Sequence, residues 1–190
     1  TNYFGGGEPN FNPGSTFFPL IDYFYTASLY THAANVSTAF GIIQADTFLN
    51  ATQAYRTVYR TVHSNNTISS LNIQASDDGL NPNGGQFFGR DSAGGTMFNL
   101  EVSDVLVDGK KHWFFFAYNA ATADYICIID GKPATMASET ANTGTQSSGS
   151  SADFGLGSND TGTATVDYEG EISFFGYDDQ YMTNWEDFFF

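Results

Sequence analysis

The sequence predicts an all-β protein, because its clearest local signals are tight turns beside short apolar runs. Asp-Gly pairs at 108–109 and 130–131 accompany two such runs, Trp113 to Tyr118 and Tyr125 to Ile129. Asp-Gly tolerates the positive φ angles of hairpin turns, and aromatic and β-branched residues favour a pleated surface. We therefore predict a β-hairpin between residues 106 and 132. The length of 190 residues fits a single β-sandwich domain.

The first residues differ in character from the rest. Residues 1–16 contain a triple glycine and two prolines without any apolar period, which predicts an extended arm. Residues 17–190 form the single predicted domain. Within it, residues 17–30 alternate loosely and predict the first strands, and the second half of the stretch 39–62 predicts another.

Later elements are predicted in the same way. Residues 86–89 and 96–102 follow turn-rich sequence and are strand candidates. Residues 134–152 are almost all Ala, Ser, Thr, Gly and Asn, which bury little, so we expect a long mobile surface loop. Thr183 and Glu186 have the spacing of a capping box, which predicts a short C-terminal helix.

A family resemblance runs through roughly residues 96 to 188. Asp108-Gly109-Lys110-Lys111-His112-Trp113, followed by an apolar run, resembles the Asp-Gly-Lys-Trp-His-His signature of laminin-G-like domains. Further segments resemble that family's later strands: Cys127 to Lys132, Phe154 to Gly157, Asp167 to Ile172 and Tyr177 to Asp179. The resemblance implies a concanavalin A-like jelly roll, a sandwich of two antiparallel sheets, of the kind found in phage or viral surface structural proteins. It also implies a structural hydrogen-bonding role for His112 at a strand start.

Charge excludes several partners. The chain has 21 acidic residues against 6 Lys plus Arg, a formal charge of −15 that repels nucleic acid and anionic lipid. It has no apolar run of the roughly 18 residues that a membrane span needs, and no signal peptide is visible. The single cysteine, Cys127, lies in an apolar run and is expected to be structural.

Catalytic patterns are missing from the sequence, so we predict a protein that is not an enzyme. Glucanases related to this fold carry Glu-x-Asp-x-Glu on one strand, and no such run occurs. Glu101 and Asp104 would face opposite sides of a strand, whereas Glu169 and Glu171 share a face but lack the central Asp. The three histidines show no metal-ligand spacing.

One loop offers hard oxygen ligands of the type that Ca²⁺ prefers, and Ca²⁺ is the one candidate cofactor. The candidate ligands are Asp77, Asp78, Asn81 and Asn83. Such residues also serve simply to satisfy turn backbones, and this alternative is the stronger one.

The run from Trp113 to Tyr118 is apolar on both faces, since Phe114 and Phe116 lie on one and Trp113 and Phe115 on the other. A sheet of a simple sandwich buries only one face, so the second requires a cover. That cover is a segment of the same chain, a protein partner or a glycan. Candidate partner-binding residues are Trp113, Phe115 and three aromatic residues of the arm, Tyr3, Phe4 and Phe11.

Two classes of function remain open. The first is a virion-surface structural protein, such as a capsid decoration, fibre or tail component, that assembles with other subunits and also binds glycans. The second is an extracellular carbohydrate-binding lectin or adhesin domain, with a divergent glycan hydrolase as a minor alternative. The expected location is the virion surface or the extracellular space.

Overall fold

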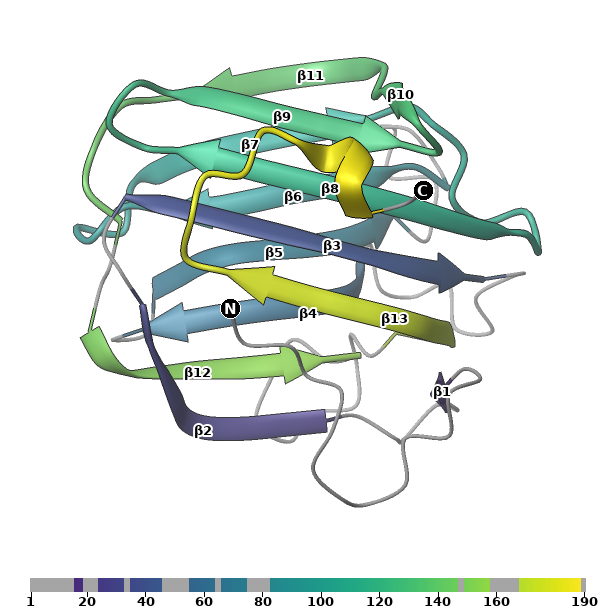
Figure 1. The fold of residues 1–190 in the computed structure, drawn as a ribbon, viewed down its shortest axis with the longest axis horizontal. Helices are drawn as coiled ribbons and strands as arrows, with labels where there is room; N and C mark the ends of the chain where they lie inside the picture. The colour runs from purple at the N-terminus through teal and green to yellow at the C-terminus, as the bar shows by residue number, and fades with distance from the viewer. Residues whose placement is uncertain are drawn as a thin grey trace.

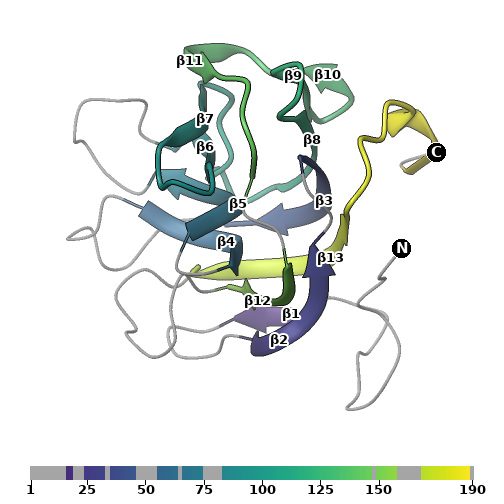
Figure 2. The ribbon, with the colours of Figure 1, turned by 90° about the vertical axis from the view of Figure 1, so that its left-hand side faces the viewer.

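The computed structural model describes residues 16–18, 24–32, 35–45, 55–63, 66–74, 83–146, 149–157 and 168–188. The described strands form two antiparallel sheets that pack face to face (Figures 1 and 2). The predicted all-β sandwich is therefore confirmed. The arm lies almost wholly outside the described residues, which include only Thr16 from it. Within the described part of the chain, no helix is long and apolar enough to cross a membrane.

The six-stranded sheet faces the viewer in Figure 1. Its strands, in spatial order, are β1 (Thr16–Phe18), β13 (Gly170–Asp178), β3 (Val36–Gln44), β8 (Lys111–Asn119), β9 (Asp124–Ile129) and β10 (Lys132–Pro133). A short 3-10 helix, η1 (Trp185–Phe188), follows β13 and lies on the outer side of this sheet (Figure 2).

The seven-stranded sheet lies behind it. Its strands, in spatial order, are β11 (Met136–Ala141), β7 (Thr96–Val102), β6 (Gly85–Arg90), β5 (Asn66–Gln74), β4 (Tyr55–His63), β12 (Gly149–Leu156) and β2 (Phe24–His32). The strands predicted at 86–89 and 96–102 coincide with β6 and β7, and the strand expected before residue 62 is β4.

The predicted hairpin is confirmed as β8 and β9, which pair from Phe114 and Ile129 to Asn119 and Asp124. Its own turn is formed by residues 120–123. The two Asp-Gly pairs lie at the opposite end, where Gly109 precedes β8 and Gly131 connects β9 to β10, both with positive φ. The two Asp-Gly pairs therefore lie at the open end of the β8–β9 hairpin and not in the turn that joins its two strands.

One expectation is wrong: residues 134–152 are not a long loop. They contain β11 and the start of β12. β11 forms because it pairs along β7 at the edge of the sheet, where main-chain hydrogen bonds stabilise a strand whose side chains are mostly exposed. The sequence patterns also do not predict β3 and β5, which occupy interior positions of the two sheets.

The core between the sheets is unusually aromatic. Phe87 of the seven-stranded sheet stacks on Phe116 of β8 with ring centroids 4.5 Å apart, and Tyr59 stacks on Phe114 at 6.2 Å. All four rings are at most 1% exposed. Cys127 is buried in the same core, and burial raises the pKa of its thiol, which makes it a structural residue rather than a nucleophile.

On the outer face, a glycine makes room for an aromatic ring. Gly176 of β13 pairs with Phe40 of β3, and a Cβ at position 176 would lie 2.3 Å from the Phe40 ring. Phe40 therefore lies over the β13 backbone.

We predict that Gly176→Ala lowers the free energy of unfolding by about 1 to 3 kcal/mol, because the ring and neighbouring strands must move to admit the methyl group. Gly144→Ala is the matched control, since its Cβ would meet only the flexible end of Met97. Urea denaturation of both variants measures the difference. Equal stabilities would show that the outer face tolerates the added volume.

Candidate functional site

The outer face of the six-stranded sheet carries a second apolar cluster, separate from the core. Its buried residues are Phe40, Phe115, Ala117 and Ile128. Partly buried residues packed against them are Trp113, Ile126, Tyr181, Met182, Trp185 and Phe188. Four of these belong to residues 179–188, which we call the C-terminal strap. The strap crosses the outer face of β3 and β8 in Figure 1.

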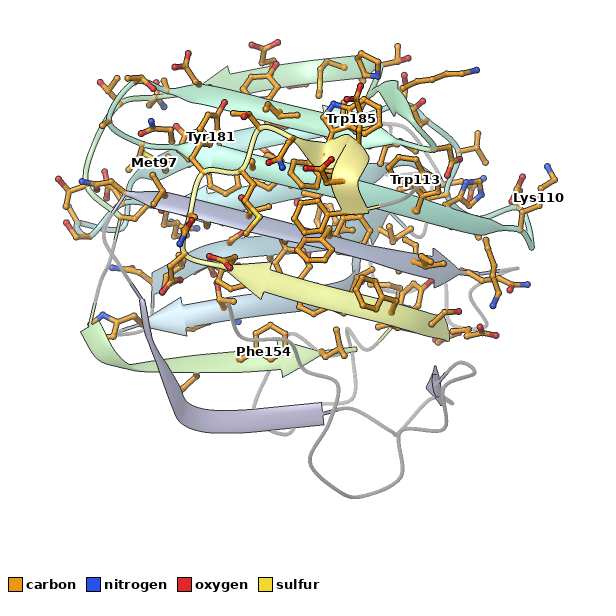
Figure 3. All side chains as sticks on the ribbon, in the orientation of Figure 1. Met97, Lys110, Trp113, Phe154, Tyr181 and Trp185 are labelled. Carbon is orange, nitrogen blue, oxygen red and sulfur yellow. The ribbon has the colours of Figure 1, made fainter. Side chains whose placement is uncertain are left out.

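Aromatic contacts and one threonine fix the strap in place. Phe188 contacts Phe40 and Phe115 with centroid distances of 4.5 and 5.8 Å, and Trp185 lies 6.0 Å from Trp113 (Figure 3). The Thr38 hydroxyl donates to the carbonyl of Gln180 at 2.6 Å and accepts from the Met182 N–H at 3.2 Å. The cover of the doubly apolar strand is therefore a segment of the same chain.

This cover decides what the sequence-predicted partner residues can do. Phe115 is 0% exposed beneath the strap, so it is not a contact residue for a partner while the strap is in place. Trp113 is only partly buried and remains in part accessible. The aromatic residues of the arm, Tyr3, Phe4 and Phe11, lie outside the described residues.

His112 links the two Asp-Gly turns at the outer end of the hairpin. Its Nδ1 lies 2.7 Å from the Asp130 carboxylate and its Nε2 2.9 Å from that of Asp108. Two carboxylates can only accept, so both ring nitrogens donate and the imidazole is protonated. The Trp113 N–H also donates to Asp130 at 3.0 Å. The structural role expected for His112 is thus seen directly.

The same contacts govern the titration of this group. Burial acts to lower the pKa of His112, but hydrogen bonds and charges from Asp130 and Asp108 outweigh it, so the pKa lies above its ordinary value. Hydrogen bonds from Lys110 and then His112 hold the pKa of the Asp108 carboxyl well below its usual range. Both pKa shifts favour the state in which His112 is protonated and Asp108 is ionised.

A row of polar side chains crosses the outer face of the seven-stranded sheet. Leu71, Phe87 and Leu100 align across β5, β6 and β7 and point into the core, so their neighbours in sequence point outward. The outward residues of one row are Thr57, Asn72, Gln86 and Glu101. Ser70, Phe88 and Asn99 form the adjacent row.

Hydrogen bonds connect this face in one direction, from β4 to β7. The Thr57 hydroxyl donates to Asn72 at 2.9 Å, Asn72 donates to Gln86 at 3.3 Å, and Gln86 donates to Asn99 at 2.9 Å. We call these four residues the amide ladder. In each of these pairs the side-chain oxygen of the second residue accepts the hydrogen bond, and its N–H groups donate to the next residue. Asn99 is the last residue, so the ladder ends in the N–H groups of its amide.

Apolar and charged groups accompany the ladder. Phe88 is half-buried on the same face, with the Arg90 guanidinium 5.1 Å from its ring centroid. Glu101 stands next to Asn99 on this face of β7 and is 5% exposed. The sequence pattern suggests Glu101 only as a catalytic carboxylate and does not predict the ladder. The alternating polar positions in each strand are the sequence signal from which an outward polar face could be predicted.

Three of the four carboxylates weighed for catalysis bind other residues of the chain. Glu169 forms an ion pair with the buried Arg56 at 3.1 Å, and Glu171 forms one with Lys111 at 2.7 Å. Asp104 accepts the N–H of Thr135 at 2.7 Å.

The calcium loop is only partly described. Asp77, Asp78 and Asn81 lie outside the described residues, whereas Asn83 is exposed, has positive φ, and accepts the Leu106 N–H through its carbonyl at 2.8 Å. Across the described ranges, no group of three His, Cys, Asp or Glu residues could hold a metal ion. The calcium site stays a prediction.

Comparisons with known proteins support the fold. No family model and no curated protein sequence matches this chain. Among solved structures, domains LG4-5 of the mouse laminin α1 chain align with a TM-score of 0.59 and 13% identity, covering 94% of this chain and 45% of that one. The heptameric SAP-like pentraxin of Limulus polyphemus aligns with a TM-score of 0.59 and 14% identity, covering 95% of this chain and 76% of that one. A Trypanosoma rangeli sialidase aligns with a TM-score of 0.53 and 8% identity, covering 78% of this chain and 21% of that one.

At these identities the likeness shows the fold alone, and the fold is a concanavalin A-like jelly roll. The chain spans under half of the laminin fragment.

The raised pKa of His112 predicts how the stability of the protein depends on pH. Because its folded-state pKa is raised, its contribution is complete below about pH 6.5 and is lost as the pH rises through the folded-state value. We expect the native melting temperature to fall from about pH 6 to about pH 9 by a few degrees more than that of His112→Gln. Calorimetry across this range compares the two, and identical pH profiles would contradict the charged clamp.

Proposed function

We propose that this chain is a non-enzymatic binding module and that it binds a glycan on the outer face of its seven-stranded sheet. The amide ladder is the observation that supports this assignment. A glycan presents many hydroxyl groups that both donate and accept, and a row of amides and hydroxyls offers both kinds of partner.

Several properties of this face suit a sugar. Neighbouring strands lie about 4.8 Å apart, so one ligand can contact the half-buried Asn72, Gln86 and Asn99 at once, while the buried Thr57 supports them from β4. The ladder fixes its own side chains by hydrogen bonds, which lowers the entropy that binding must remove. Half-buried Phe88 adds an apolar surface for the face of a sugar ring.

The non-enzymatic assignment rests on the carboxylates. Glu169 and Glu171, the pair that would share a strand face, each lie in an ion pair with a basic residue. A general acid or nucleophile of a glycosidase instead needs a carboxyl group open to the scissile bond. We propose an extracellular or virion-surface location, where glycans are encountered.

We predict that Gln86→Ala weakens glycan binding by at least about tenfold, because it breaks the ladder and leaves the acceptor of Asn99 without its donor. A screen of immobilised oligosaccharides followed by calorimetry measures this. Gln180→Ala is the control, since it removes an exposed amide on the opposite side of the molecule. Retained affinity in Gln86→Ala, or binding to no oligosaccharide, would contradict the proposal.

A second candidate is a structural subunit of a virion surface, such as a capsid decoration, fibre or tail protein. Exposed apolar surface beside the strap favours it: Phe174 is 40% exposed, and its ring lies 5.7 Å from Phe40. Trp113 and Trp185 are partly exposed on the same side. Such a surface suits contact with another subunit.

For this candidate we expect a defined oligomer in solution that dissociates when Phe174 is changed to Ser or when residues 1–16 are removed. Light scattering coupled to size exclusion gives the mass of each species. A monomeric native chain would rule out self-assembly and leave the glycan-binding role.

A further inference from the structure

We infer that the β7 end of the amide ladder binds the protonated amino group of an amino sugar, with Glu101 as its partner. This inference rests on the proposed glycan-binding function and names the chemical class of the ligand. Glu101 lies opposite Gln86 in the sheet register, on the outer face between the core residues Leu100 and Val102.

Glu101 is the acidic residue at the β7 end of this face. The residue is 5% exposed, and among the residues that the structure describes it has neither a hydrogen bond nor an ion pair. Its oxygens do not belong to the fully buried polar atoms that lack a partner, so the carboxylate is accessible from outside the sheet. A cationic group of a ligand can therefore bind it.

Asn99 supplies the complementary group. Its amide oxygen already accepts from Gln86, while its N–H groups have no partner within the described ranges. Residues two apart on a strand share a face and lie about 7 Å from one another. The pair therefore presents a donor and an anionic acceptor side by side, which fits a sugar that carries a hydroxyl next to an amino group.

Charge selects a cationic ligand over a neutral or anionic one. The two arginines on this face are distant from Glu101: Arg60 lies on β4, three strands and about 14 Å away, and donates to Thr67. Arg90 lies at the far end of β6, where it donates to the carbonyl of Gly94. With a chain charge of −15, uronic acids and sulfated sugars are repelled. A charge-assisted bond from an ammonium group is also about twice as strong as one from a hydroxyl.

The test uses four soluble oligosaccharides of equal length: a β-1,4-glucosamine oligomer, its N-acetylated form, a β-1,4-glucan and a polyuronate. Calorimetry is done at about pH 5.5, where the amine is protonated. We expect the glucosamine oligomer to bind at least about tenfold more tightly than the N-acetylated form or the glucan, and the polyuronate not to bind. Glu101→Gln should lower the affinity for the glucosamine oligomer to that for the glucan. Glu186→Gln, an equal charge change on the exposed strap, should have no effect.

The outcomes separate this inference from the proposed function. Equal binding of neutral and amino sugars, with no effect of Glu101→Gln, overturns the inference and leaves the glycan-binding role intact. Binding of none of the four overturns both. Oligolysine is also tested as a ligand that carries ammonium groups but no sugar. If it binds as tightly as the glucosamine oligomer and Glu101→Gln weakens both, the carboxylate is a general cation site and the assignment to an amino sugar fails.

Discussion

Burial of β8 on both faces is the constraint on which the arrangement of this molecule depends. Phe114 and Phe116 point into the core between the sheets, while Phe115 points the opposite way and is equally buried. A two-sheet sandwich provides only one interior, so a third layer is required. The C-terminal strap is that layer, and Thr38 of the neighbouring strand holds it by two hydrogen bonds to its backbone.

The hairpin that contains β8 is fixed at its outer end by charge rather than by apolar contact. His112 donates to Asp108 before β8 and to Asp130 after β9, so one imidazolium holds two turns together. The Asp130 carboxylate also receives the N–H of Trp113, and Gly131 leaves the space against the Trp113 ring where a Cβ would lie 3.2 Å away. The position of the indole that meets the strap thus depends on the same turns.

The two outer faces of the sandwich consequently have different chemistry. On the six-stranded sheet, apolar side chains are covered by the chain itself, and a small aromatic surface around Phe174 remains. On the seven-stranded sheet, amide and hydroxyl groups bind one another in a directed row that ends beside the Glu101 carboxylate. The first face suits contact with protein and the second suits a polar ligand, so the two proposed roles occupy separate surfaces.

The sequence alone determined the β8–β9 hairpin and the need for a cover over Phe115, because turn chemistry and alternation are local properties. The structural role of His112 was implied by the family resemblance. The tertiary structure decided what the cover is, since alternation shows that a face is apolar without showing which distant segment packs on it. It also decided that β11 is a strand, because main-chain pairing with β7 has no signature in side chains. The amide ladder depends on the register of four strands, including the unpredicted β5 and a bulge between Thr57 and Tyr59. Polar residues that are unremarkable in each strand become one site only when the sheet aligns them.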